Sequence, residues 1–129
     1  MRILVLDDDP ARGAAFRRAL VGHSVSVVTT APEAIGRLAG GGWDAASLDH
    51  DLGGQQMAES GPGTGWEVAR WLADNPDRIP REVVLHSLNP AGRARMAAVL
   101  PGAAEAPGWW ALGGWPAGAF SEDRRSDAL

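Results

Sequence analysis

The most informative stretch of the sequence is Ala46-Ser47-Leu48-Asp49-His50-Asp51-Leu52-Gly53-Gly54. In this stretch a short apolar run ends abruptly in two carboxylates that flank an imidazole. A continuous apolar run of this kind is typical of a strand covered on both faces. Because glycines follow at once, the polar groups stand at the edge of the expected sheet. We predict a strand over residues 44–49 whose carboxyl end carries reactive side chains.

On both sides of this strand, apolar runs alternate with helical segments. The other expected strands cover residues 3–6, 25–29 and 83–85, with a fifth at residues 109–112. Each expected helix starts after a residue that can cap free N–H groups, and these residues are Asp9, Thr30, Thr64 and Asn89. The alternation predicts an α/β fold with a doubly wound parallel sheet of four to five strands and helices on both faces.

Length and composition limit the number of domains and the kinds of binding site that the chain can form. With 129 residues and 45% hydrophobic composition, the chain can form one domain with a core, which we expect over residues 1–118, followed by a polar tail at 119–129. A net charge of −4 argues against a bulk nucleic-acid binding surface, which needs a basic face. The absence of cysteine excludes disulfides and thiolate metal sites.

Two further absences narrow the classes of function. No apolar run approaches the roughly 18 residues that a membrane span needs, and Asp7 interrupts the N-terminal run before a signal-peptide core could form. We therefore expect a cytoplasmic protein with no membrane partner. All 12 basic residues are arginines, which excludes any mechanism that requires a lysine.

Polar side chains follow three of the expected strands. They are Asp7 and Asp8 after the first strand, Asp49, His50 and Asp51 after the third, and His86 and Ser87 after the fourth. In doubly wound sheets, ligands bind outside the carboxyl ends of the strands, where the strand order reverses. We expect these side chains to converge on one crevice.

The carboxylates of this group predict a divalent metal site, because clustered acids repel one another unless a cation relieves the charge. The expected ligands are Asp7, Asp8, Asp49 and Asp51. Mg²⁺ is the expected ion because it prefers oxygen ligands, and Mn²⁺ and Zn²⁺ are alternatives. A Zn²⁺ site would use His50, Asp51 and His86, since imidazole suits that ion.

The start of the fourth helix predicts a phosphate-binding site. Its free N–H groups favour anions, and Ser87, Asn89 and Arg93 can add side-chain donors. His50 and His86 are candidates for acid–base chemistry near neutral pH. The tryptophans of the C-terminal region are expected in the core or in a lid, with stacking on a base as the alternative. They are Trp109, Trp110 and Trp115.

Structural roles compete with the functional ones at several positions. Asp9 is typical of a helix cap. Asp49 and Asp51 can instead form the turn before the glycine pair. Because alternate residues of a strand face opposite sides of a sheet, His50 can point away from Asp49.

The acids after the first strand, the acid after the third and the hydroxyl residue after the fourth resemble the receiver domain of two-component response regulators. In that family the acids hold Mg²⁺ and the acid after the third strand accepts phosphate. By position these residues are Asp7, Asp8 and Asp49, with Ser87 as the hydroxyl residue. Receivers also use a lysine after the fifth strand, which this chain lacks.

The runs Asp49-His50-Asp51 and His86-Ser87-Leu88-Asn89-Pro90-Ala91-Gly92 instead resemble a divergent branch, the cyclic-phosphate processing receiver-like domains. This resemblance covers roughly residues 1–100. It implies a receiver/flavodoxin-like fold and an enzyme that acts on cyclic phosphodiesters, such as a 2′,3′-cyclic phosphate at an RNA end or the cyclic phosphate of ADP-ribose.

The expectation is therefore a metal-assisted hydrolase that opens a small cyclic phosphate or RNA-end substrate; no feature of the sequence predicts an oligomeric state. Asp49, His50 and His86 would be catalytic, and Ser87, Asn89 and Arg93 would hold the phosphate. Two alternatives belong to other classes. One is a signalling module that is phosphorylated on Asp49, and the other is a degenerate receiver that acts as a protein-interaction domain.

Overall fold

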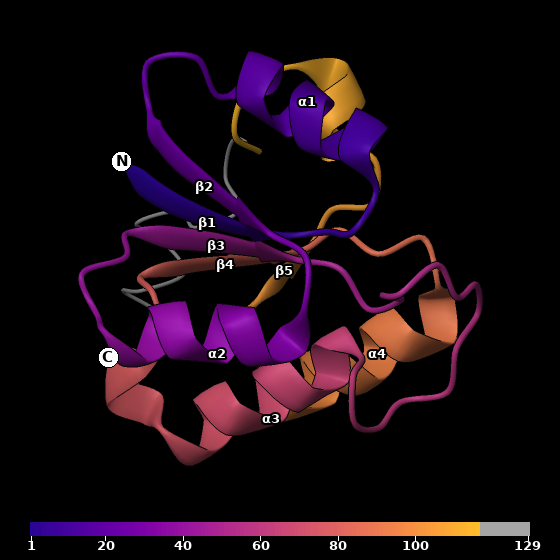
Figure 1. The fold of residues 1–129 in the computed structure, drawn as a ribbon. Helices are drawn as coiled ribbons and strands as arrows, with labels where there is room; N and C mark the ends of the chain where they lie inside the picture. Colours follow the sequence, from indigo (N-terminus) through magenta and orange to yellow (C-terminus); the bar gives the residue numbers. More distant parts are fainter. Residues whose placement is uncertain (117–129) are drawn as a thin grey trace.

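The computed structural model describes residues 1–116, which form one five-stranded parallel sheet with helices on both faces (Figure 1). The strands are β1 (Arg2–Leu6), β2 (Ser24–Val28), β3 (Ala45–Leu48), β4 (Glu82–Leu85) and β5 (Ala104–Glu105). The helices are α1 (Pro10–Ala19), α2 (Ala31–Ala39), α3 (Gly65–Asp74) and α4 (Pro90–Val99), with short 3₁₀ turns η1 (Pro76–Arg78) and η2 (Trp109–Leu112). The expected boundary at residue 118 and the tail at 119–129 lie outside the described residues.

The strand order is β2-β1-β3-β4-β5, so the direction of winding reverses between β1 and β3. This order confirms the expected doubly wound sheet. It also means that the carboxyl ends of β1 and β3 flank the point where such sheets bind ligands.

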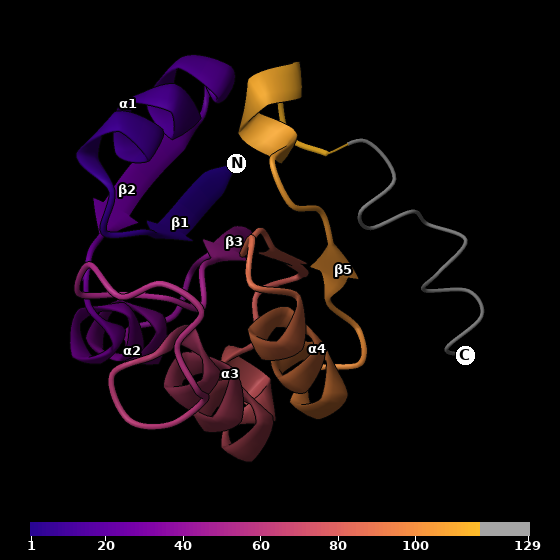
Figure 2. The ribbon, with the colours of Figure 1, turned by 90° about the vertical axis from the view of Figure 1, so that its right-hand side faces the viewer.

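Two hydrophobic layers sandwich the sheet. Helices α2, α3 and α4 cover one face, while α1 and η2 cover the other (Figures 1 and 2). The side chains of β1 alternate between these layers, with Leu4 and Leu6 in the larger one and Ile3 and Val5 in the smaller. No helix within residues 1–116 is long and apolar enough to cross a membrane.

Three of the four expected helix caps form as predicted. The side chains of Asp9, Thr30 and Asn89 each accept hydrogen bonds from backbone N–H groups in the first turn of their helix. Thr64 makes no such bond, and its hydroxyl donates instead to the carbonyl of Gly61 at 2.7 Å. The first N–H of α3, that of Gly65, donates to the carbonyl of His50 at 2.8 Å, so this helix starts directly against the end of β3.

The prediction of a fifth strand at residues 109–112 is wrong. The fifth strand is Ala104–Glu105, which pairs with β4, and residues 109–112 form η2. Gly108 has a φ of 74°, a conformation that favours glycine, and it turns the chain away from the sheet edge. Trp109 then packs under α1 against Phe16, with ring centroids 5.5 Å apart. Trp109 is buried but Leu112 is 90% exposed, so the apolar pattern indicated neither the backbone conformation nor the burial of the whole segment.

Candidate active site

Three polar side chains share one face of the sheet because of strand register. The paired positions on β1, β3 and β4 are Val5, Ser47 and Val84. Two residues further along each strand are Asp7, Asp49 and His86, and these again face the α1 side because side chains alternate. Their ligand atoms lie within 4.8 Å of one another, and all three residues are buried. The predicted convergence of the strand ends therefore occurs for these three.

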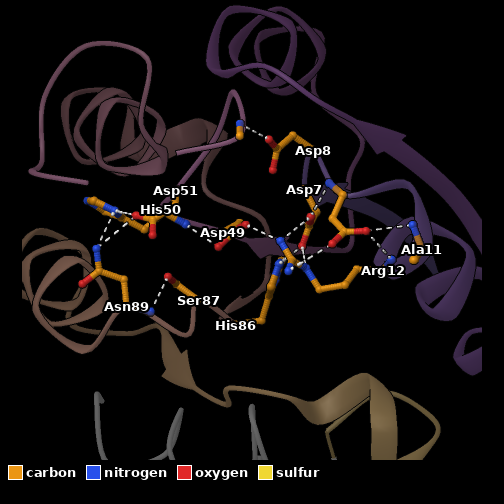
Figure 3. Close-up of polar contacts among 12 residues, drawn as sticks. Asp7, Asp8, Ala11, Arg12, Asp49, His50, Asp51, His86, Ser87 and Asn89 are labelled. Carbon is orange, nitrogen blue, oxygen red and sulfur yellow. Dashed lines mark hydrogen bonds and ion pairs between the residues drawn. The ribbon is translucent and has the colours of Figure 1, made fainter. Parts of the chain in front are cut away.

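Arg12 lies among these acids, and sequence reasoning did not single it out. Its Nε and Nη2 donate to the two carboxylate oxygens of Asp7 at 2.9 and 3.0 Å, and Nη2 also contacts Asp49 Oδ2 at 3.3 Å (Figure 3). The cap of Asp9 starts α1 so that Arg12, in the first turn, points back toward the end of β1. The available signal was an arginine three residues after a helix cap that follows an acidic strand end.

The pKa values of the two buried carboxyl groups, Asp7 and Asp49, shift in opposite directions. Burial acts to raise the pKa of Asp7, but hydrogen bonds from His86 and Arg12 outweigh it, so the pKa of Asp7 is lowered. Burial raises the pKa of Asp49, and the charge of nearby Asp7 adds to this effect. The hydrogen bond to Asp7 raises the pKa of Arg12, which therefore stays charged. The site thus pairs an ionised carboxylate with one that binds a proton more readily.

The imidazole of His86 is held by a chain of hydrogen bonds. Trp109 Nε1 can only donate, and it does so to Ser47 Oγ at 3.1 Å. The Ser47 hydroxyl proton is then available for His86 Nδ1, 2.7 Å away, so His86 Nε2 donates to Asp7 Oδ2 at 2.9 Å. The ring also packs against Phe16, with centroids 4.8 Å apart. These contacts set the tautomer and the orientation of His86.

His50 faces the opposite side of the sheet from Asp49. Its side chain is fully buried, Nδ1 donates to Asp51 Oδ1 at 2.7 Å, and Nε2 lies 2.9 Å from Ser60 Oγ. The ring packs so closely on Gly92 of α4 that an added Cβ there would overlap it. Among the residues predicted to be catalytic, His50 therefore does not reach the groups around Asp49 and His86. Its contacts position the loop instead.

Several predicted ligands anchor the loop of residues 52–63. The N–H of Gly54 donates to Asp8 Oδ2 at 2.8 Å, and the N–H of Met57 donates to Asp51 Oδ2 at 2.7 Å. Asn89 Nδ2 donates to Asp51 Oδ1 at 3.0 Å (Figure 3). Burial acts to raise the pKa of Asp51, but its hydrogen bonds to His50 and Asn89 lower it overall. The loop is thus held across the edge of the sheet by side chains from three strand ends.

A pocket of about 520 Å³ lies between this loop, α1 and the start of α4. Predicted residues contribute much of its lining, namely Asp8, Asp49, Asp51, His86, Ser87 and Asn89. Arg12 adds a cation, while Met57, Leu88 and Trp110 add apolar surface. Arg93 is outside the lining, since its guanidinium donates to the Ser87 carbonyl at 2.7 Å and to Glu105 at 3.0 Å.

The donor set fits a divalent cation in part. The carboxylates of Asp7 and Asp49 lie close enough to share one ion, whereas the imidazole of His86 in the same cluster already uses both ring nitrogens on Ser47 and Asp7. The carboxylates of Asp8 and Asp51 lie at the pocket wall and bind backbone N–H groups of the loop. The four acids predicted as one metal site are therefore divided into a buried pair and two anchors of the loop.

Residues 2–101 match the family described as Cyclic-phosphate processing Receiver domain. No curated protein matches the sequence at a significant level.

Solved structures show the same fold at low sequence identity. The response regulator TrrA from Thermotoga maritima, in complex with Mg²⁺ and BeF, has a TM-score of 0.63 at 20% identity, over 98% of this chain and 96% of that one. A CheY-like receiver domain protein from Methanospirillum hungatei has a TM-score of 0.65 at 17% identity, over 83% and 80%. A response regulator from Burkholderia pseudomallei with a phosphorylated aspartic acid has 0.62 at 15% identity, over 98% and 70%.

Proposed function

The chain belongs to the cyclic-phosphate processing receiver family, and from that premise we propose that it hydrolyses a cyclic phosphodiester at the carboxyl edge of its sheet. One observation carries the proposal, which is the cluster of Asp7, Asp49 and His86 with Arg12 beside a pocket of about 520 Å³. Such a cluster combines a positive group for a phosphate with an imidazole that can move protons.

In the proposed reaction, a water oxygen attacks the phosphorus atom and one of the two ring P–O bonds breaks. The departing sugar oxygen takes a proton, and the product is a phosphate monoester. We assign both proton transfers to His86, which lines the pocket and would take the proton of the water and return it to the departing oxygen, and we assign Asp49 to a divalent ion. His50, which makes no contribution to the pocket lining, is assigned to positioning Asp51 and the loop.

A divalent ion, Mg²⁺ or Mn²⁺, would be held by Asp7 and Asp49. When bound it would polarise the phosphate and lower the pKa of a coordinated water. Asp7 also keeps the imidazole of His86 in place through its bond to Nε2 at 2.9 Å. These roles make Asp7 a residue that serves both the ion and the base.

Ser87 is the best placed of the three predicted phosphate-binding residues. Its Oγ accepts the Asn89 N–H at 3.1 Å, which leaves the hydroxyl proton to donate to a phosphate oxygen. Asn89 uses its carboxamide to cap α4 and to bind the loop, and Arg93 braces the Ser87 carbonyl. We therefore assign phosphate contact to Ser87 and support of its backbone to Arg93.

The apolar part of the lining supports a nucleoside-type substrate. Met57 and Leu88 are 66% and 57% exposed, and with Trp110 they line the same pocket as the charged groups. A ligand with a phosphate at one end and a flat apolar group at the other matches this division. A nucleoside 2′,3′-cyclic phosphate and the cyclic phosphate of ADP-ribose both meet the requirement.

A substrate panel tests the proposal. Phosphate-monoester formation should be measured from 2′,3′-cyclic nucleotides and cyclic-phosphorylated ADP-ribose, with and without Mg²⁺ and Mn²⁺. We expect turnover that is lost in Asp49→Ala and kept in Asp77→Ala, a matched change at a side chain that is 77% exposed in η1. Absence of turnover across the whole panel with both metals supplied would contradict the hydrolase.

A phosphorylated signalling module is the second candidate. Asp49 follows β3 and Ser87 follows β4, the positions that receivers use for the phosphorylated acid and its hydroxyl partner, and the similar response regulator from Burkholderia pseudomallei carries a phosphorylated aspartic acid. The absence of lysine counts against this candidate. This candidate would be favoured if the protein takes up labelled phosphate from acetyl phosphate, if Asp49→Asn loses that uptake, and if no cyclic phosphodiester of the panel is hydrolysed.

A further inference from the structure

We propose that Arg12 is the built-in counter-ion of Asp7 and Asp49, and that a divalent metal binds this pair only by displacing it. The inference rests on the metal site of the proposed function but does not depend on hydrolysis. It makes Arg12 the residue that sets how strongly the pocket responds to metal.

All four oxygens of the buried acids are already engaged. Arg12 donates to both oxygens of Asp7, at 2.9 and 3.0 Å, and His86 shares one of them. On Asp49, Oδ1 accepts the backbone N–H of His50 at 2.8 Å, and Oδ2 accepts Arg12 Nη2 at 3.3 Å. An ion that bound both acids would need at least one oxygen from each, so it would take positions that Arg12 now occupies.

Distance and charge both make joint occupancy unfavourable. A Mg²⁺ ion sits about 2.1 Å from a carboxylate oxygen and prefers near-octahedral surroundings. The guanidinium nitrogens lie 2.9 to 3.3 Å from the same oxygens, which leaves no room for the ion between them. A divalent cation and a guanidinium at this separation also repel strongly in a site of low dielectric.

The displaced side chain can remain at the pocket. Arg12 is 30% exposed and lines the pocket, and its Nη1 already lies 3.4 Å from Asp9 Oδ2 at the solvent side of the cluster. A guanidinium that moves toward Asp9 would face the pocket, where a phosphate can take a fork of two N–H groups. The exchange therefore frees an anion-binding group at the moment the metal arrives, in a chain that has no lysine to supply one.

Calorimetric titration of Mn²⁺ into the substrate-free protein tests this exchange. We expect Arg12→Gln to bind Mn²⁺ about tenfold more tightly than the wild type, because the ion no longer has to break the charged hydrogen bonds to Asp7. Arg18→Gln, an exposed change on the same helix, should leave the affinity unaltered. Equal or weaker Mn²⁺ binding by Arg12→Gln would overturn the proposal, and so would failure of every variant to bind the ion.

Thermal melts provide a second readout. Without metal, Arg12→Gln leaves two buried acids without their cation, so its Tm should fall below that of the wild type, and Mn²⁺ should restore it. If Arg12→Gln does not fold, Arg12→Lys can be tested in its place. Arg12→Lys keeps one positive charge but loses the two-pronged contact, so its Mn²⁺ affinity should lie between that of the wild type and the tenfold higher affinity expected for Arg12→Gln. Metal binding that is unchanged in Arg12→Lys would then contradict the exchange. Since neither measurement uses a substrate, failure here is separate from failure of the hydrolase.

Discussion

The imidazole of His86 donates through Nε2 to the carboxylate of Asp7 at 2.9 Å, although the two residues are 79 positions apart in the chain. Both side chains are essentially buried, at 1% and 0% exposure. The pair exists because β1, β3 and β4 are adjacent and in register. A histidine oriented by a buried carboxylate is a recurring way to hold one tautomer for proton transfer.

Replacement of His86 should remove most turnover. In His86→Asn the group assigned to proton transfer is lost, and acid–base catalysis of this kind contributes about a hundredfold or more to the rate. The measurement is kcat/KM on the best cyclic substrate of the panel, with a circular dichroism spectrum to verify folding. His23→Asn, at an exposed histidine beside the N-terminus, is the matched control and should retain full activity. Undiminished kcat/KM in folded His86→Asn would remove His86 from the mechanism.

Asp49→Asn should stabilise the fold at pH 7 by about 1 kcal/mol, because it removes a buried negative charge that lies beside the carboxylate of Asp7. The pKa of Asp49 is raised above its ordinary value of 3.8, first by burial, so ionisation disfavours the folded state. This penalty is fully present above the folded pKa and disappears as the pH falls toward 3.8. Chemical unfolding at several pH values should therefore show an advantage for Asp49→Asn that shrinks in acid.

Asp7→Asn is the contrasting variant. Hydrogen bonds from His86 and Arg12 outweigh the effect of burial and lower the pKa of Asp7, so its ionised form stabilises the folded state. That contribution is present above 3.8 and is lost as the pH falls through the lowered pKa. Asp7→Asn should lose about 3 kcal/mol at pH 7, since it breaks a buried pair from one side. Shifts of the same sign in both variants would contradict the assigned electrostatics.

Ser47→Ala should cost about 2 kcal/mol, because it leaves the buried Trp109 N–H and His86 Nδ1 without their shared partner. The same change should shift the pH profile of turnover, since the hydrogen bond that sets the His86 tautomer is lost. Ser26→Ala on β2 is the control and should stay within about 0.5 kcal/mol of the wild type. Denaturant unfolding and a pH–rate profile check the two parts; an unaltered profile would mean that Ser47 has only a structural role.

Gly65→Ala should destabilise the protein by about 3 kcal/mol, at the upper end for overpacking, because the added Cβ would overlap the backbone carbonyl of Asp49. Relief requires α3 to move away from the end of β3. Gly36→Ala in α2 meets open space and should instead stabilise by about 1 kcal/mol through helix propensity. Urea unfolding of the two variants measures both effects, and a stable Gly65→Ala would show that the contact between α3 and Asp49 can relax.

The sequence by itself determined the alternation of the first four strands with four helices, three of the four helix caps and the shared sheet edge at which Asp7, Asp49 and His86 lie. These features follow from local patterns and from the rule that parallel strand ends share one edge. The same alternation of side chains allowed His50 to point away from Asp49, and in the structure it does.

Only the tertiary structure decided which acids share a cation. Arg12 carries no motif of its own, and its role depends on how far α1 returns over the ends of β1 and β3. Likewise, Asp8 and Asp51 bind a loop whose path no local pattern predicts. The expected strand at residues 109–112 is η2 in the structure, where Gly108 turns the chain and Trp109 packs against Phe16 of α1. Local propensity selects the elements, whereas the partners of a charged side chain depend on contacts between residues distant in the chain.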